Sequence, residues 1–136
     1  MSEVTPTILT IYDTDMIIWN GKEYINGSGP FGAPDMTDFA KELHIMGEGA
    51  SISADAKVTL SRVYNGMDMT IEPDNTLVVS EGIQNDGLIF IENNASLVQE
   101  SLNDLNTGTG TYQVKRDGIR TPERFNVSSQ CQRHII

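Results

Sequence analysis

The chain has little of what most catalytic and metal-binding sites require. Its 136 residues include one cysteine, Cys131, and two histidines, His44 and His134, which lie far apart in the sequence. One cysteine excludes an internal disulfide, and no Cys/His spacing typical of a zinc site occurs. His44 lies outside any nucleophile motif, so a Ser-His-Asp triad is not indicated. We therefore expect no catalytic residues, no metal ligands, no cofactor and no enzymatic activity.

Basic residues are also scarce. Nine Lys and Arg stand against nineteen Asp and Glu, which gives a net charge of −10. This charge repels phosphate backbones, so nucleic acid is not an expected partner. No stretch approaches the roughly 20 apolar residues of a membrane span, and membrane insertion is not expected. The N-terminus has no basic region followed by an apolar one, as a signal peptide would have.

The sequence has no long helical pattern, but it has a repeat that is typical of β-strands and turns. Segments 43–52, 69–77 and 89–97 each combine an apolar-x-apolar pair, a turn rich in Gly, Asn or Asp, and then a small polar and an aliphatic residue. Their spacing is 26 residues from Ile45 to Ile71 and 20 from Ile71 to Ile91. Such a period is typical of solenoid coils. The sequence predicts an all-β chain with a short β-solenoid, right-handed by precedent.

Stacking the coils predicts which residues form rows along the solenoid. The expected inward rows are Ile45, Ile71 and Ile91, and Ile52, Leu77 and Leu97; the expected outward row is His44, Thr70 and Phe90. Leu88 and Phe90 are apolar where earlier coils carry polar residues. Two interpretations stay open. The C-terminal segment covers both side chains, or they form a contact surface for another molecule, including a second copy.

Three regions follow from this pattern. Residues 1–38 are predicted to hold short strands and a capping loop, 39–99 the solenoid coils, and 100–136 a C-terminal β segment and tail. The expected strands outside the repeats are 4–12, 16–19, 111–116 and 125–127. Glycine and proline break the chain over 26–38, where we expect a loop without regular structure. Turns rich in Asp and Asn leave calcium binding open, although none has the EF-hand pattern.

Aromatic residues gather before the repeats, at Tyr12, Trp19, Tyr24 and Phe31. An open solenoid end exposes an apolar cross-section and strand edges, so these side chains are candidates for a cap. Aromatic faces also stack on sugar rings, which makes Trp19, Tyr24 and Phe31 candidate glycan contacts. A polysaccharide-cleaving site would need clustered charges, for which the outward candidates are Asp68, Glu72, Lys57 and Arg62.

Several phrases, taken in order, are familiar. Ile18-Trp19-Asn20-Gly21 leads into a Gly/Pro/Asp loop, "TIEPDNTLVVSEGIQNDGLIFIENNASLVQ" follows, and "NTGTGTYQVKRDG" comes next. Over roughly residues 17–129 the chain resembles the secreted and cell-surface proteins of Bacteroidetes that the type IX secretion system carries. The chain departs from that pattern because it has neither the signal peptide nor the C-terminal sorting domain of such proteins. Residues 130–136 match none of the family's phrases.

The resemblance implies a non-enzymatic structural or adhesive module of an extracellular or cell-surface protein. The chain would then be a fragment, a mature segment or a truncated relative. Its expected partners are copies of itself or other surface proteins, with assembly through the solenoid ends. The alternative is a carbohydrate-binding module that acts through Trp19, Tyr24 and the 26–38 loop.

Overall fold

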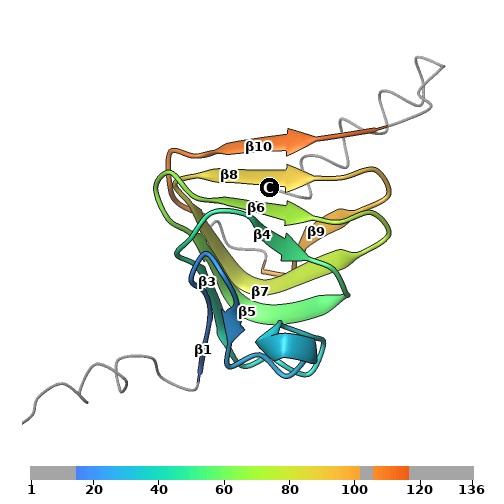
Figure 1. Ribbon diagram of the computed structural model, residues 1–136. Helices are drawn as coiled ribbons and strands as arrows, with labels where there is room; N and C mark the ends of the chain where they lie inside the picture. Colours follow the sequence, from blue (N-terminus) through green and yellow to red (C-terminus); the bar gives the residue numbers. More distant parts are fainter. Residues whose placement is uncertain (1–14, 102–105, 117–136) are drawn as a thin grey trace, which may run out of the picture.

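The computed structural model describes residues 15–101 and 106–116. The predicted strands at 4–12 and 125–127 lie outside these residues, as do Tyr12, Cys131 and His134. In the described part, the regular structure is β-strand apart from one 3-10 turn (Figure 1). The elements are β1 (Met16–Trp19), β2 (Tyr24–Ile25), η2 (Pro30–Gly32), β3 (Glu42–Ile45), β4 (Ala50–Ile52), β5 (Ala56–Val63), β6 (Asp68–Ile71), β7 (Thr76–Asn85), β8 (Leu88–Ile91), β9 (Ser96–Gln99) and β10 (Thr111–Val114).

The strands form two sheets that the chain visits in alternation. The larger sheet, sheet A, has the order β2-β1-β3-β5-β7-β9, and the smaller, sheet B, has the order β10-β8-β6-β4. Every pairing is parallel except that of β1 with β2. β1, β2 and β3 all lie in sheet A; from β3 onward consecutive strands lie in different sheets, and each circuit stacks on the one before it (Figure 1). This arrangement is the short β-solenoid that the repeat predicts.

Each of the long strands β5 and β7 makes two sides of its own coil. Their register shifts between Val58 and Leu60, where the ladder is irregular. A bulge at this kind of position bends the strand and lets one strand turn a corner. The first half of β7 then pairs with β9, and the second half of β5 with β3.

The core is a stack of aliphatic side chains between the sheets. The central strands alternate, so that Met69 and Ile71 of β6 are fully buried while Asp68 and Thr70 are half-buried. Burying one such aliphatic side chain stabilises the fold by about 1.5–3 kcal/mol. The buried aliphatic and alanine side chains of the core are Ile17, Leu43, Ile45, Ala50, Ile52, Ala56, Val58, Val63, Met69, Ile71, Leu77, Val79, Ile83, Ile89, Ile91, Ala95 and Leu97.

The predicted rows are partly wrong. Ile71 does stack on Ile91, but their partner from the first coil is Ile52, and Val114 extends the row. Ile45 belongs to sheet A, where it pairs with Val63. Leu77 and Leu97 do share a row, and Ala56 is the first-coil member in place of Ile52.

His44 also lies elsewhere than predicted. Ser51, not His44, precedes Thr70 and Phe90 in the outward row of sheet B. His44 lies in sheet A in register with Arg62, and its ring is nearly buried. Its Nε2 lies 2.9 Å from Glu42 Oε1, and its Nδ1 lies 3.0 Å from the Tyr64 hydroxyl oxygen. These contacts hold the ring against the sheet.

The 26–38 loop contains no strand or α-helix, but it does include the 3-10 turn Pro30–Gly32, which the prediction of no regular structure missed. The loop is organised around the buried carboxylate of Asp38. Both the amide and the hydroxyl of Ser28 donate to this carboxylate, at 3.0 and 2.6 Å, and the Asp35 amide donates at 2.9 Å. The Lys41 ammonium lies 3.3 Å away. Burial alone would raise the pKa of Asp38, but these hydrogen bonds outweigh it and lower the pKa.

At the other end of the solenoid, Asn85 fastens the segment that follows the last coil. Its side-chain amide donates to the Thr111 carbonyl at 3.0 Å, and its backbone carbonyl accepts from Gly110 at 2.7 Å. Its backbone amide donates to Thr107 at 3.0 Å. A Cβ on Gly108 would lie 2.1 Å from the Asn85 carbonyl oxygen, so the segment approaches too closely for any other residue. This anchor sets β10 beside β8 as a further strand of sheet B.

Candidate functional site

The candidate site lies at the end of the solenoid where β1 and β2 close sheet A. These two strands are antiparallel, and their register places Trp19 directly opposite Tyr24. The ring centroids are 4.9 Å apart and the planes are tilted by 59°. The connecting turn is held by the Asn20 side chain, whose oxygen accepts from the amides of Lys22 and Glu23. A local side-chain bond of this kind fixes a tight turn.

Both rings pack against the end of the core, and the polar atom of each ring donates a hydrogen bond to a backbone carbonyl. Trp19 Nε1 donates to the Glu48 carbonyl and the Tyr24 hydroxyl donates to the Ser51 carbonyl, each at 2.7 Å. Ser51 belongs to β4, the strand at the edge of sheet B. Burial raises the pKa of Tyr24 well above its usual value, although the bond to Ser51 acts in the opposite direction. The two rings are therefore fixed in position by both packing and hydrogen bonds.

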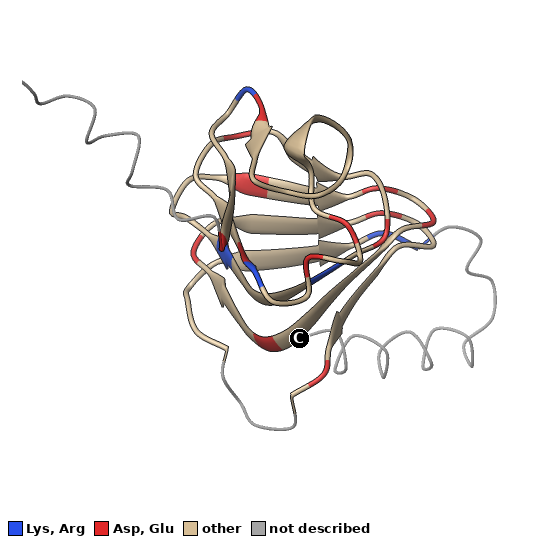
Figure 2. Ribbon diagram, turned by 90° about the horizontal axis from the view of Figure 1, so that it is seen from below, with Lys and Arg blue, Asp and Glu red and all other residues tan. Residues whose placement is uncertain are grey.

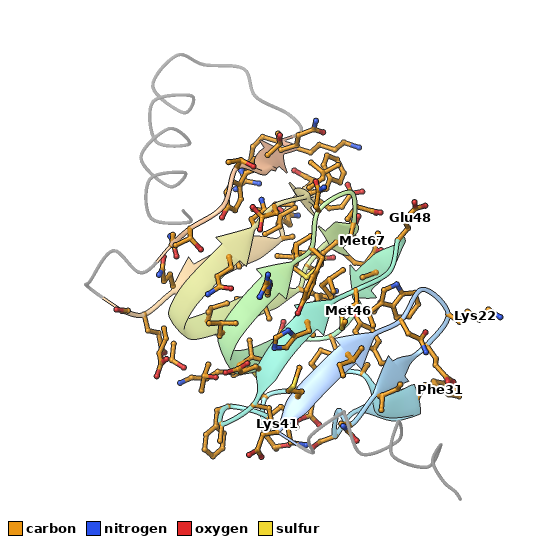
Figure 3. The ribbon with its side chains drawn as sticks, turned by 90° about the vertical axis from the view of Figure 1, so that its left-hand side faces the viewer. Lys22, Phe31, Lys41, Met46, Glu48 and Met67 are labelled. Carbon is orange, nitrogen blue, oxygen red and sulfur yellow. The ribbon has the colours of Figure 1, made fainter. Side chains whose placement is uncertain are left out.

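Phe31 behaves differently from the other two aromatic residues. Its side chain is 96 % exposed, and it lies outside the core. Its backbone has φ 57° and ψ 33°, a left-handed conformation that is a genuine outlier for a bulky residue. The surrounding loop enforces this geometry: the Gly27 amide donates to the Gly32 carbonyl at 2.8 Å, and the Gly29 amide to Ala33 at 2.8 Å. Figure 3 shows Phe31 on the same flank of the molecule as Lys22.

Two neighbouring hollows share the three aromatic residues. The first has a volume of about 360 Å³, within the range of small-molecule sites. It is lined by Trp19, Tyr24, Pro30, Phe31, Ala33, Pro34, Gly49, Ser51, Ile52, Ser53 and Ala54. The second has a volume of about 470 Å³ and is lined by Trp19, Lys22, Glu23, Tyr24 and Phe31. We call the two together the aromatic groove.

The groove combines apolar walls with a few polar groups. Its first hollow is lined by aromatic residues and prolines together with the serines Ser51 and Ser53. Its second hollow adds an ammonium and a carboxylate. A site of this composition orients a ligand with a flat apolar face and a polar edge.

The sequence points to Trp19, Tyr24 and Phe31 as candidates, and the structure brings them together around the two hollows, but the sequence does not point to the other lining residues. Ser51, Ser53 and Ala54 follow the first turn of the repeat, and nothing in their pattern distinguishes them from other coil residues. They line the hollow together with Trp19 because β4 is the edge strand of sheet B and is joined to Tyr24 by the hydrogen bond to the Ser51 carbonyl. Gly47 permits this approach: a Cβ there would lie 2.2 Å from the Gly21 amide nitrogen.

Leu88 and Phe90, the other candidate contacts, lie on β8 in the middle of sheet B. β10 pairs with β8 and places Thr111 beside Leu88 and Gln113 beside Phe90. Both apolar side chains are half-buried. The C-terminal segment therefore extends the sheet next to them.

The charged residues considered for polysaccharide cleavage do not share one strand. Asp68 begins β6 of sheet B and Glu72 directly follows that strand, whereas Lys57 and Arg62 lie in the two halves of β5 in sheet A. Lys57 forms an ion pair with Glu100 at 3.2 Å, and Arg62 stacks on the Tyr64 ring at 4.3 Å.

Among residues 15–101 and 106–116, no group of three His, Cys, Asp or Glu side chains is placed to hold a metal ion. The described part of the chain contains no helix long and apolar enough to cross a membrane. No family model matches the sequence, and neither a curated protein nor a solved structure matches it.

Proposed function

We propose that the chain is a non-enzymatic adhesive module of a secreted or surface-exposed bacterial protein, and that its contact site is a saccharide-binding aromatic groove. The resemblance in sequence supports the proposal of a secreted or surface-exposed protein, and the aromatic groove supports the proposal of a saccharide ligand. A saccharide presents a flat apolar face of C–H groups and an edge of hydroxyls. The rings of Phe31 and Trp19 can stack on the apolar face. The polar side chains of the groove can form hydrogen bonds with the hydroxyls; these are Ser51, Ser53, Lys22 and Glu23.

The exposure of Phe31 is the observation that carries the proposal. An aromatic side chain normally contributes by burying 150–250 Å². Phe31 leaves almost all of its surface in water and adopts a backbone conformation that costs about 1–3 kcal/mol. Neither property stabilises the fold, and this supports a role for Phe31 in contacting a ligand. A sugar ring stacked on Phe31 would bury the apolar surface that this side chain leaves exposed in the folded chain.

Rigidity is the contribution of the solenoid to this function. Trp19 and Tyr24 are fixed by hydrogen bonds to the turn before β4 and to β4 itself, and hydrogen bonds within the 26–38 loop hold the backbone on either side of Phe31. Ligand binding then loses little conformational entropy, because these side chains are already ordered in the free protein. Modest affinity per site suits an adhesive module, since several copies on one surface multiply the effect.

Calorimetric titration with a panel of polysaccharides tests the proposal. The wild-type chain should bind at least one member, and Phe31→Ala should remove most of the binding without lowering the unfolding temperature. Phe39→Ala is the matched control, because Phe39 is 58 % exposed and does not line the groove. Equal binding by wild type and Phe31→Ala would exclude the groove, and no binding to a broad panel would exclude a saccharide ligand.

Self-association is a second candidate, favoured by the position of β10. Within the described residues, β10 pairs with β8 alone and forms an edge of sheet B. An open edge strand pairs readily with another chain. In that case the molar mass from light scattering should rise with concentration, and Phe90→Asp, next to β10, should reduce the rise. A constant monomer mass would exclude this second role.

A further inference from the structure

We infer that the aromatic groove takes a neutral, linear oligosaccharide of at least two sugar units, one in each hollow, with Phe31 as the ridge between them. This inference rests on the proposed saccharide function and adds the length and charge of the ligand. It follows from the way in which the two hollows share their walls and from the distribution of charge around them.

The length follows from the shared residues. Trp19, Tyr24 and Phe31 line both hollows, so the two spaces adjoin along these side chains. Phe31 is almost fully exposed, and it stands out from the loop with both faces free of the core. A single sugar unit fills one hollow and leaves the other face of the ridge in water. A chain of two or more units covers both.

The two hollows differ in the groups that can select a ligand. The first is lined by no charged side chain, and its remaining polar side chains are Ser51 and Ser53, because the Trp19 indole N–H and the Tyr24 hydroxyl already donate to backbone carbonyls. The second has Lys22 and Glu23, which form no ion pair with any described residue. The Asn20 side chain fixes the backbone that carries them. One donor and one acceptor of full charge are thus available for hydroxyl or amide groups of a second unit.

The charge of the ligand follows from the absence of an unopposed cation in the groove. A uronic acid in the first hollow would meet no basic side chain. In the second hollow, the carboxylate of Glu23 offsets the ammonium of Lys22, and the exposed Glu48 side chain belongs to the turn that accepts the Trp19 hydrogen bond. Figure 2 shows Asp and Glu on many turns around the molecule, in keeping with its net charge of −10. A polyanion would be repelled at this surface.

The test compares chain length and charge on wild-type and variant proteins by calorimetry. The probes are the monosaccharides and linear hexasaccharides of glucose, xylose and N-acetylglucosamine, together with hexagalacturonate. We expect at least one neutral hexasaccharide to bind about tenfold or more tightly than its monosaccharide, a difference that corresponds to about 1.4 kcal/mol. The double variant Lys22→Ala/Glu23→Ala should remove most of that gain in affinity from monosaccharide to hexasaccharide.

The outcomes separate this inference from the function on which it rests. Equal affinity for a monosaccharide and its hexasaccharide would overturn the second subsite while leaving a saccharide site in place. Tighter binding of hexagalacturonate than of every neutral hexasaccharide would overturn neutrality alone. An unchanged gain in the double variant would remove Lys22 and Glu23 from the site. No binding of any probe to the wild-type chain would overturn both the inference and the saccharide function.

Discussion

The Tyr24 hydroxyl donates a hydrogen bond of 2.7 Å to the Ser51 carbonyl, and so joins the cap strand of sheet A to the edge strand of sheet B. This bond closes the end of the solenoid and at the same time forms part of the groove. Stability of the end and the shape of the candidate site therefore depend on the same side chain.

Tyr24→Phe tests this bond. Removing the donor leaves a partly buried carbonyl without its partner, which should lower the free energy of unfolding by about 1–3 kcal/mol. Denaturant unfolding at pH 7 measures the loss. Tyr64→Phe is the comparison, because Tyr64 does not line the groove and its hydroxyl contacts the His44 ring in place of a backbone carbonyl.

The same side chain should make stability depend on pH in the alkaline range. The pKa of Tyr24 is raised in the folded state, so the folded chain holds a proton that the unfolded chain releases near the ordinary value of about 10. The resulting stabilisation is complete below pH 10 and is lost as pH rises toward the folded pKa. Unfolding curves at pH 9 and pH 11 should show a larger fall for wild type than for Tyr24→Phe. Parallel curves would contradict a buried, protonated Tyr24.

Asp38 should make stability depend on pH in the acid range. Its folded pKa is lowered, so the stabilisation is present above the unfolded value of about 3.9 and is lost as pH falls through the folded pKa. Asp38→Asn should destabilise the chain at pH 7 by about 1–3 kcal/mol and abolish that part of the acid dependence. Asp74→Asn is the control, since Asp74 is exposed with φ 69° and asparagine tolerates this conformation.

Asn85 should govern the end of the solenoid that carries β10. Asn85→Ala removes the side-chain donor to Thr111 and the side-chain acceptor of the Gly87 amide. Amide hydrogen exchange at Gly110 and Thr111 should quicken by a larger factor than exchange within β6. Uniform quickening of exchange would mean that Asn85 stabilises the whole fold and not this segment. As the control, Asn65→Ala at an exposed turn should leave exchange unchanged both at Gly110 and Thr111 and within β6.

The repeat was sufficient to predict the solenoid but not the phase of its coils. Ile45 and Ile52 flank a turn from sheet A to sheet B, whereas Ile71 and Leu77 flank a turn from sheet B to sheet A. Both kinds of corner need an aliphatic residue, a tight turn and another aliphatic residue, so their local patterns are alike. Only strand pairing distinguishes the two kinds of corner. Because pairing joins residues about one coil apart, a local pattern does not reveal it.

The candidate site shows the same limit. Clustering before the repeats identified Trp19, Tyr24 and Phe31, because aromatic residues are few and their position is informative. The difference between them was not predictable: Trp19 and Tyr24 pack on the core, and Phe31 projects into water. That difference depends on the left-handed turn at Phe31 and on the Asp38-centred loop, which brings together residues ten positions apart.

Mapping a neutral hexasaccharide on the chain by two-dimensional NMR tests the central claim most directly. Trp19 is the one tryptophan of the sequence, so its indole N–H gives an unambiguous signal. The account predicts that binding shifts this signal together with the amides of Phe31, Ser51 and Ser53, and that Phe31→Ala suppresses all of these shifts. Shifts confined to Leu88, Phe90 and β10, or no shift with any hexasaccharide of the panel, would contradict it.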